Sequence, residues 1–192
     1  FIMSKLETNQ VDPATGTTLT LGTSGDTITI PSGVTIANSG TATGFGESNL
    51  PYFYVTRDSN QTISTSTYTV IQFDSVELDT ASGYNTGTYR YTPNVAGKYF
   101  FQFVLQSTYG GSAPVNEYGE LRKNGTSVVE TSARGNGHGY GSITQGSAIL
   151  TMNGSSDYID VRSYGDSGTS YILEGNGTLK RTYLLGYLVS KT

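Results

Sequence analysis

The sequence contains no cysteine and no tryptophan, and only 14% of its residues are charged. Without cysteine the chain cannot form a disulfide, supply a thiolate nucleophile or bind zinc through thiolates. Acidic residues outnumber basic ones, which gives a formal net charge of −4. Because Lys and Arg also form no runs, the chain lacks a basic surface for a phosphate backbone, and we expect no nucleic-acid partner.

Long apolar stretches are also missing. No segment approaches the roughly 18 to 20 apolar residues that a membrane-spanning helix needs. Residues 1–30 lack the basic start and the apolar middle of a signal peptide. From the sequence alone we therefore expect a chain that is neither inserted in a membrane nor exported.

The residues that are abundant are those of a β-protein. The 192-residue chain has 25 Gly, 15 Tyr and 7 Phe, together with many Thr and Ser residues. All of its aromatic residues except Phe1 and Phe45 lie after Pro51. This change in composition predicts a stalk or anchor segment over residues 1–46 and a head domain over residues 47–192.

Three short phrases recur in the N-terminal segment, each with two apolar residues around a threonine: Leu19-Thr20-Leu21, Ile28-Thr29-Ile30 and Val34-Thr35-Ile36. Glycine, proline and serine between the phrases predict turns. Strands this short cannot form a core within one chain, so the segment is either disordered or paired with the same phrases of other copies. The regular spacing favours a short multi-chain β stalk.

The head is dense in strand signals, and no segment of it has helical periodicity. Asn124-Gly125, between two β-rich runs, predicts a tight hairpin. We expect strands over residues 52–56, 69–78, 88–92, 98–106, 117–123, 127–131, 141–152, 158–163, 170–173 and 178–189. About ten short strands predict an all-β sandwich or barrel.

Residues 98–106 form the strongest strand signal. Tyr99, Phe101 and Phe103 would point to one face of this strand, and Phe100, Gln102 and Val104 to the other. One of the two faces would serve the core. Because the other face also carries large side chains, we expect it to form a subunit interface.

A spaced pattern of aromatic residues and glycines identifies the head more closely. It comprises Phe73, Asp79, Tyr84, Tyr91, Gly97, Tyr99, Phe101 and Phe103, with Gly186 in the last predicted strand. The pattern closely resembles the signature of the globular head of complement component 1q, a jelly roll shared with the tumour necrosis factor family. One position departs from the signature, because Tyr91 stands where the family has phenylalanine, and a buried tyrosine hydroxyl needs a partner. The resemblance implies a ten-stranded jelly-roll sandwich that assembles as a homotrimer.

Residues suited to catalysis are sparse. The only histidine, His138, lies in a glycine-rich loop without a nucleophile motif, and the acidic residues are scattered. We therefore expect a binding protein and no enzyme activity. The candidate binding residues lie in or beside glycine-rich connections, where a tyrosine ring would be exposed and would stack on a sugar or anchor a protein; the alternative is that they are packing or rim residues. They are Tyr109, Arg134, Asn136, His138, Tyr140, Tyr164 and Asp166.

No cofactor is expected, with one exception that the resemblance raises. Several proteins of the complement component 1q family bind Ca²⁺ near the trimer apex through carboxylate and carbonyl oxygens. The candidates for such a site here are Asp157, Asp166 and Glu174, none of which belongs to an EF-hand-like sequence.

The N-terminal phrases are similar to repeats near the N-termini of tailed-phage fibre and appendage proteins. Together with the missing signal peptide, this similarity predicts a virion structural protein, a trimeric tail fibre or head fibre. Residues 1–46 would bind other virion proteins, and the head would attach to a glycan or protein of the host surface or decorate the capsid. The alternatives are a non-viral secreted or adhesive binding module of the complement component 1q type and, less favoured, a glycan-cleaving enzyme.

Overall fold

The structure is a computed structural model of the chain. It describes residues 11, 13, 15–35, 37, 50–109, 116–134, 141–166 and 170–192. The chain divides into two compact units, Phe1–Phe45 and Gly46–Thr192. Among the described residues there is no helix long and apolar enough to cross a membrane.

In the N-terminal unit, the described residues 15–35 form turns and contain no strand. The carboxylate of Asp26 closes one turn by accepting hydrogen bonds from the backbone N–H and the hydroxyl of Thr23, at 2.7 and 3.0 Å. The apolar side chains of the phrases that the structure describes, those from Leu19 to Val34, are exposed, from 45% for Leu19 to 62% for Leu21. In this part of a single chain the phrases have no partner strand, so the multi-chain β stalk stays a prediction.

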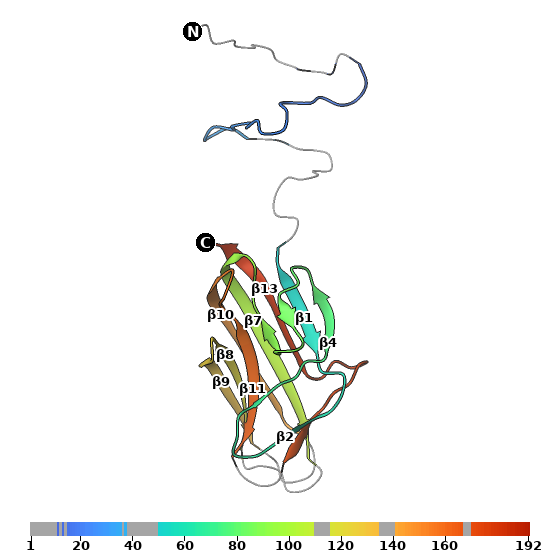
Figure 1. The fold of residues 1–192 in the computed structure, drawn as a ribbon, viewed down its shortest axis with the longest axis vertical. Coiled ribbons are helices and arrows are strands. Elements are labelled where there is room, and N and C mark those ends of the chain that lie inside the picture. Colours follow the sequence, from blue (N-terminus) through green and yellow to red (C-terminus); the bar gives the residue numbers. More distant parts are fainter. Residues whose placement is uncertain are drawn as a thin grey trace. The chain divides into compact units, whose positions relative to one another are not determined.

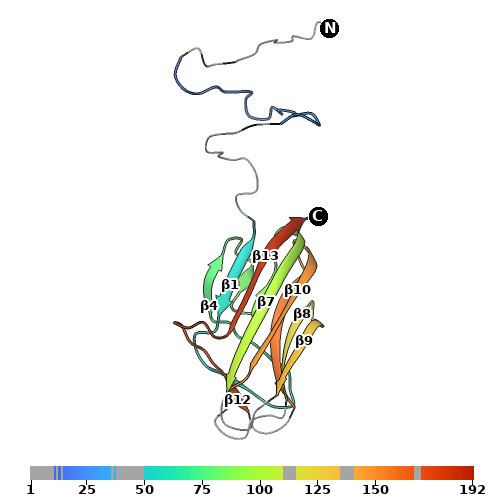
Figure 2. The ribbon, with the colours of Figure 1, turned by 180° about the vertical axis from the view of Figure 1, so that it is seen from behind.

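The head is a sandwich of two antiparallel sheets, seen from opposite sides in Figures 1 and 2. The seven-stranded sheet has the order β2-β12-β7-β13-β1-β4, with β10 also paired to β7. The six-stranded sheet has the order β5-β6-β11-β8-β9, with β3 also paired to β11. The predicted all-β sandwich is therefore confirmed. The strands are β1 (Tyr52–Thr56), β2 (Gln61–Ile63), β3 (Thr69–Val70), β4 (Ser75–Asp79), β5 (Tyr84–Asn85), β6 (Arg90–Tyr91), β7 (Ala96–Thr108), β8 (Asn116–Lys123), β9 (Thr126–Arg134), β10 (Ile143–Asn153), β11 (Ile159–Gly165), β12 (Tyr171–Leu173) and β13 (Tyr183–Lys191).

The hairpin between β8 and β9 is confirmed. Asn124 and Gly125 both have a positive φ, 51° and 81°, as a tight two-residue hairpin turn requires. The single strand expected over residues 69–78 is wrong, because β3 and β4 are separate strands. Between them, the side chain of Gln61 accepts the backbone N–H of Gln72 at 2.9 Å, which replaces a strand partner there.

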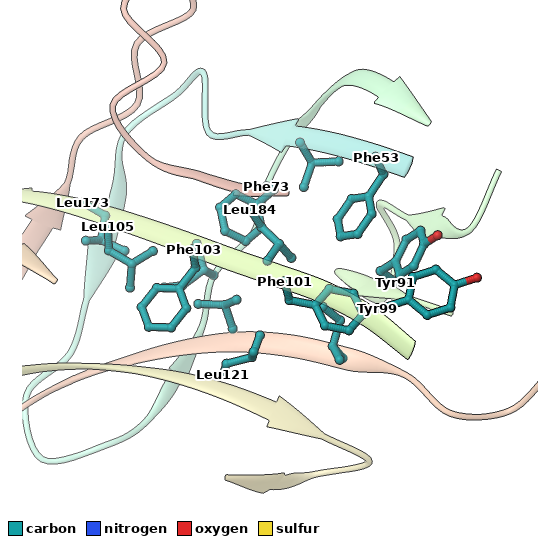
Figure 3. Close-up of a cluster of buried hydrophobic side chains, with 14 of the residues drawn as sticks. Phe53, Phe73, Tyr91, Tyr99, Phe101, Phe103, Leu105, Leu121, Leu173 and Leu184 are labelled. Carbon is teal, nitrogen blue, oxygen red and sulfur yellow. The ribbon is translucent and has the colours of Figure 1, made fainter. Parts of the chain in front are cut away.

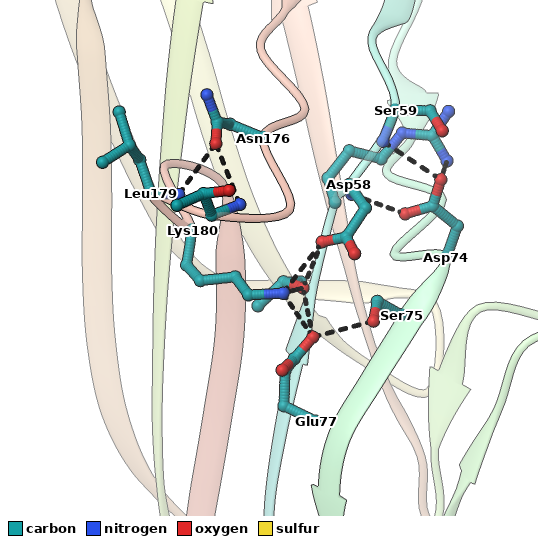
Figure 4. Close-up of polar contacts among 11 residues, drawn as sticks. Asp58, Ser59, Asp74, Ser75, Glu77, Asn176, Leu179 and Lys180 are labelled. Carbon is teal, nitrogen blue, oxygen red and sulfur yellow. Dashed lines mark hydrogen bonds and ion pairs between the residues drawn. The ribbon is translucent and has the colours of Figure 1, made fainter.

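The last strand, β13, begins at Tyr183, later than predicted. Before it, the side-chain oxygen of Asn176 accepts two backbone N–H groups, at 2.8 and 3.0 Å, and so closes a turn (Figure 4). Lys180 ends this turn with a positive φ of 48°, and its ammonium group forms ion pairs with Asp58 and Glu77. The turn is thus fixed to the loop after β1 and to β4, which stops the strand from starting earlier.

Strand β7 supplies the centre of the core, as Figure 3 shows. Tyr99, Phe101, Phe103 and Leu105 point inward and are fully buried. The residues between them, such as Phe100, are half-buried on the outer side of the sheet. The predicted alternation along this strand is confirmed.

Glycines of the signature make room for this aromatic core. A Cβ atom on Gly186 would lie 2.6 Å from Cδ1 of Phe101 and 2.7 Å from Cε1 of Phe53. A Cβ atom on Gly97 would lie 2.4 Å from the carbonyl oxygen of Ser190. Side chains do not approach other atoms so closely, so only glycine fits at these two positions without a shift of its neighbours.

The aromatic residues of the signature pack against one another beside these glycines. Tyr91 is fully buried and stacks on Phe53, with ring centroids 3.8 Å apart. Tyr84 donates its hydroxyl to the carbonyl of Phe73 at 3.2 Å, and Asp79 accepts the backbone N–H of Tyr84 at 2.8 Å. The hydroxyl of Tyr91, in contrast, has no hydrogen-bond partner in the described part of the chain. Tyrosine in place of the family's phenylalanine therefore keeps the ring packing and leaves a buried polar atom unpaired.

Candidate functional site

The outer face of the seven-stranded sheet carries a row of large side chains. Tyr52 of β1 pairs with Tyr187 of β13, Tyr187 pairs with Phe100 of β7, and Phe100 pairs with Ile149 of β10. The rings of Phe100 and Tyr187 contact each other with centroids 5.3 Å apart. Tyr187 is 47% exposed and Ile149 is 61% exposed. Four adjacent strands thus present one continuous apolar row, which is a feature of interaction surfaces.

The outer face of the six-stranded sheet carries a second row, which we call the tyrosine row: Tyr68, Tyr164 and Tyr118. Tyr164 of β11 pairs with Tyr118 of β8. Tyr68, immediately before β3, stacks on Tyr164 with ring centroids 4.9 Å apart and an interplanar angle of 26°. All three rings are half-buried, so each keeps part of its surface toward solvent.

A group of polar side chains lies beside the tyrosine row, at the end of the sheet where β8 begins and where β9 and β11 end. The carboxylate of Asp166 accepts the backbone N–H of Asn116 at 2.9 Å and also accepts the side-chain amide of Asn116. Asn116 pairs in register with Arg134, which is exposed at the end of β9. The structure therefore brings three predicted binding residues, Arg134, Tyr164 and Asp166, to the same end of one sheet.

Four charged side chains lie between the tyrosine row and the opposite end of the same sheet. They were not among the candidates predicted from the sequence. Arg162 lies 3.6 Å from the carboxylate of Asp160, and Arg122 lies 3.6 Å from that of Glu120. Register pairs each arginine with the carboxylate of the neighbouring strand as well. Glu120 and Asp160 are buried, so these alternating charges neutralise one another and do not form a free basic or acidic patch.

The expectation of an exposed ring at Tyr109 is wrong. Tyr109 is only 7% exposed, and its hydroxyl donates to the carboxylate of Glu117 at 2.8 Å. The same oxygen, Oε2 of Glu117, accepts the hydroxyls of Ser107 at 2.6 Å and Ser142 at 2.5 Å. Glu117 is fully buried, and this burial raises the pKa of its carboxyl group above the usual range. Tyr109 thus closes a buried polar cluster at the end of β7, because a carboxyl group in the core needs hydrogen-bond partners.

Three further predicted binding residues, Asn136, His138 and Tyr140, lie outside the described residues. The three Ca²⁺ candidates are described and do not come together. Asp157 forms an ion pair with Lys123 at 2.9 Å, and Glu174 forms one with Arg181. In the described part of the chain, no group of three or more His, Cys, Asp or Glu side chains is placed to hold a metal.

Sequence reasoning missed Tyr68, Tyr118 and Glu130. Glu130 of β9 accepts the hydroxyl of Tyr68 at 2.6 Å, although the two residues are 62 positions apart in the sequence. Tyr118 lies inside a strand and not in a glycine-rich connection, which was the feature used to select candidates. A search for tyrosines on the polar face of alternating strands would have found it, whereas Tyr68 and Glu130 meet only through the pairing of β3, β11, β8 and β9.

Comparisons with known proteins agree with this fold. No curated protein matches the chain. Among solved structures, the chain resembles the globular domain of zebrafish complement 1qA protein, with 18% identity and a TM-score of 0.55 over 74% of this chain and 99% of that one. It also resembles the Eiger tumour necrosis factor of S. frugiperda, with 8% identity and a TM-score of 0.55 over 74% of this chain and 93% of that one. A third similar structure is murine APRIL, with 9% identity and a TM-score of 0.55 over 73% of this chain and 99% of that one.

These similarities show the jelly-roll fold, and a sequence profile shows the family. The profile of the C1q domain matches residues 52–189, which is most of the chain. It begins after the N-terminal segment and therefore lends no support to the resemblance of residues 1–46 to phage fibres. The chain belongs to the C1q domain family, whose members are non-enzymatic binding modules.

Proposed function

We propose that the chain is a homotrimeric binding module in which the outer face of the seven-stranded sheet holds the three heads together. The observation that carries this proposal is the row of Tyr52, Tyr187, Phe100 and Ile149 across four strands. Members of the C1q and tumour necrosis factor families typically form homotrimers, which supports the number three. A trimer would present three ligand-binding surfaces, and several weak contacts made together give strong attachment.

The proposal is tested by measuring the mass of the assembly in solution by light scattering. We expect a mass three times the 20.4 kDa of one chain. Tyr187→Glu places a charge in the apolar row and should shift the mass toward that of one chain, because burying an unpaired carboxylate in an interface is costly. Val128→Glu is the matched control, since Val128 is a similarly exposed apolar residue on β9 of the other sheet. Wild-type protein with the mass of one chain at micromolar concentration would contradict the trimer.

The family match favours the broader function, a C1q-type binding module, over the more specific one, a virion fibre. We propose the virion fibre as a second candidate because of the N-terminal unit, whose exposed apolar side chains need partner strands from other chains. In this proposal, residues 1–46 join the trimer to other virion proteins, and the head contacts a host glycan or protein. Mass spectrometry of purified particles tests the location. Particles that lack the chain would exclude the virion location and leave the trimeric binding module unaffected.

A further inference from the structure

Tyr68 crosses the outer face of the six-stranded sheet. The register of β3 against β11, Thr69 with Ser163 and Val70 with Arg162, brings Tyr68 beside Tyr164. Its ring covers the ring of Tyr164, and its hydroxyl reaches Glu130 on β9. Since β8 lies between β11 and β9, this one side chain extends across three strands.

Two contacts of the side chain hold Tyr68 in this position. The first is the ring stack, at 4.9 Å, and the second is the hydrogen bond to the Oε2 atom of Glu130, at 2.6 Å. A hydroxyl that donates to a carboxylate at this distance forms a strong, charge-assisted bond. Burial and the bond to Glu130 raise the pKa of Tyr68, so the hydroxyl keeps its proton and stays a donor at neutral pH.

The backbone that carries Tyr68 is anchored on one side by the short pairing of β3 with β11. On the other side, the N–H of Ser66 donates to the carbonyl of Gly165 at 2.8 Å, and Ser66 has a positive φ of 62°. Glu130, the acceptor, is exposed to solvent. The ring can therefore leave Tyr164 by a rotation of the side chain, without breaking strand pairing.

The side chains beneath Tyr68 determine which kind of ligand would fit in its place. The surface offers the face of Tyr164, the ring of Tyr118, which is tilted by 58° to it with ring centroids 5.8 Å apart, and the carboxylate of Glu130. An aromatic face is electron-rich and attracts slightly positive C–H groups, such as those on one face of a puckered sugar ring. A carboxylate at the side of that ring accepts a hydroxyl. A pyranose sugar provides both features, and Tyr68 itself provides a ring and a hydroxyl in the same two places.

The charges around the surface favour an uncharged sugar. Glu130 and Glu120 are acidic groups whose negative charges act on the hydroxyl of Tyr68 and help to raise its pKa. The nearby guanidinium of Arg162 is paired with Asp160. An anionic sugar would meet the carboxylate of Glu130 directly, whereas the exposed Arg134 lies four residues further along β9, beyond Ser132, which pairs with Tyr118.

We propose that Tyr164, Tyr118 and Glu130 form a subsite for a neutral pyranose ring, and that Tyr68 occupies this subsite until a sugar displaces it. The inference rests on the proposed function of the head as a binding module and names the ligand class. Tyr68 acts as an internal competitor, because a ligand whose site is occupied in most molecules binds with reduced apparent affinity. Removal of the Tyr68 ring should therefore strengthen binding, whereas removal of the Tyr164 ring should weaken it strongly.

The experiment measures binding of maltotriose, cellotriose and chitotriose to the full-length chain by titration calorimetry. Trigalacturonic acid and trimethyl-lysine serve as the anionic and cationic probes. We expect Tyr68→Ala to bind at least one neutral trisaccharide on the order of 5- to 10-fold more tightly than wild type, because one competing hydrogen bond and one ring contact are removed. Tyr68→Phe loses only the bond to Glu130, so its affinity should lie between those of wild type and Tyr68→Ala.

Tyr164→Ala and Glu130→Gln test the subsite itself. In the Tyr68→Ala background, Tyr164→Ala should lower affinity more than 10-fold and Glu130→Gln should weaken it several-fold. Tyr118→Ala provides a second platform variant if Tyr164→Ala does not fold. The matched control is Tyr158→Ala, which removes a half-buried tyrosine that lies under Arg90, outside the tyrosine row, and should leave sugar binding unchanged.

Three results would overturn the inference: no neutral trisaccharide binds either wild type or Tyr68→Ala, affinity is unchanged after loss of Tyr164, or trigalacturonic acid or trimethyl-lysine binds in preference. Weaker binding by Tyr68→Ala than by wild type would show that Tyr68 is part of the ligand contact and would overturn its role as a competitor. The mass of each sample separates this test from the proposed function. A trimer that binds none of the probes contradicts only the sugar subsite, whereas a monomer contradicts the trimeric module.

Discussion

The two ends of the head's core are built from different chemistry, although one strand, β7, passes through both. At one end its inward residues are Tyr99 and Phe101, which pack in an aromatic cluster with Phe53 and Tyr91 (Figure 3). At the other end its inward residue is Ser107, which bonds to the buried carboxylate of Glu117. The aromatic end is specified by shape, because glycines fit around its rings. The polar end is specified by hydrogen bonds, because three hydroxyls converge on one carboxylate oxygen.

The largest difference between the ends should appear on truncation of a core side chain. Phe101→Ala should lower the free energy of unfolding by about 3 to 5 kcal/mol, since a large buried ring is lost and a cavity is left. Ser107→Ala should cost less, roughly 1 to 2 kcal/mol, because it removes one donor to Glu117 and the acceptor for the N–H of Ser142. Denaturant titrations at one fixed protein concentration measure both values. Equal losses at the two ends would remove the distinction.

The role of shape at the aromatic end is tested at Gly186. Gly186→Ala should lower the free energy of unfolding by about 1 to 3 kcal/mol, because the added methyl group overlaps Phe101 and Phe53. The comparison variant is Gly87→Ala, whose Cβ atom would lie 3.2 Å from a side-chain oxygen of Asn85 on an exposed turn. We expect a change of a few tenths of a kcal/mol there. A harmless Gly186→Ala would show that the aromatic rings move to accommodate a side chain.

The role of charge at the polar end is tested by measuring how the stability of the protein depends on pH. Burial raises the pKa of Glu117, so the folded protein holds a proton that the unfolded chain releases above about pH 4.3. Stability should therefore fall as pH rises from that value through the raised pKa of Glu117, and then level off. Tyr109 and Tyr171 are the other titratable groups near this carboxyl, and burial raises the pKa of both, so they stay neutral over this range.

Glu117→Gln should remove this loss and flatten the profile of melting temperature against pH above about pH 4.3. Glu77→Gln is an informative control, because the hydrogen bond from Lys180 lowers the pKa of Glu77 and gives its contribution the opposite sign. Stability from Glu77 is present above its ordinary pKa and is lost as pH falls. Parallel profiles for wild type and Glu117→Gln would contradict the assignment of a buried, proton-binding carboxyl.

The smallest effect should be a gain at the aromatic end. Tyr91→Phe removes a buried hydroxyl that has no partner among the described residues, and it keeps the ring that stacks on Phe53. We expect unfolding to cost about 1 kcal/mol more in this variant. The same denaturant titration measures it. A loss of stability would mean that the hydroxyl of Tyr91 has a partner in the assembled protein.

Much of the head could be predicted from local patterns. The alternation along β7, the Asn124-Gly125 hairpin and the spacing of the signature aromatics are local features, and they indicated the all-β sandwich, the two faces of β7 and the family. The non-enzymatic nature of the head is confirmed by the family. The errors arose where side chains captured backbone groups, as Gln61 does between β3 and β4 and Asn176 does before β13.

The candidate site was harder to predict, because its residues meet only through strand pairing. Tyr164 and Asp166 were identified from their glycine-rich context, but their neighbours Tyr68, Tyr118 and Glu130 come from distant segments. Tyr109 shared that context and is buried, because its hydroxyl donates to Glu117 on β8 of the opposite sheet. A loop composition cannot distinguish these two outcomes, since it does not show which carboxylate lies beneath.

Strand β7 has a consequence for interpreting variants of this protein. Its 13 residues alternate between the interior and the outer face of the seven-stranded sheet. Under the proposed trimer, odd-numbered positions from Tyr99 to Leu105 control whether a chain folds, and even-numbered positions such as Phe100 control whether folded chains associate. Dilution separates the two classes, because only defects of association depend on concentration. Along this strand, a substitution at an odd-numbered position should thus impair folding, and one at an even-numbered position should impair assembly.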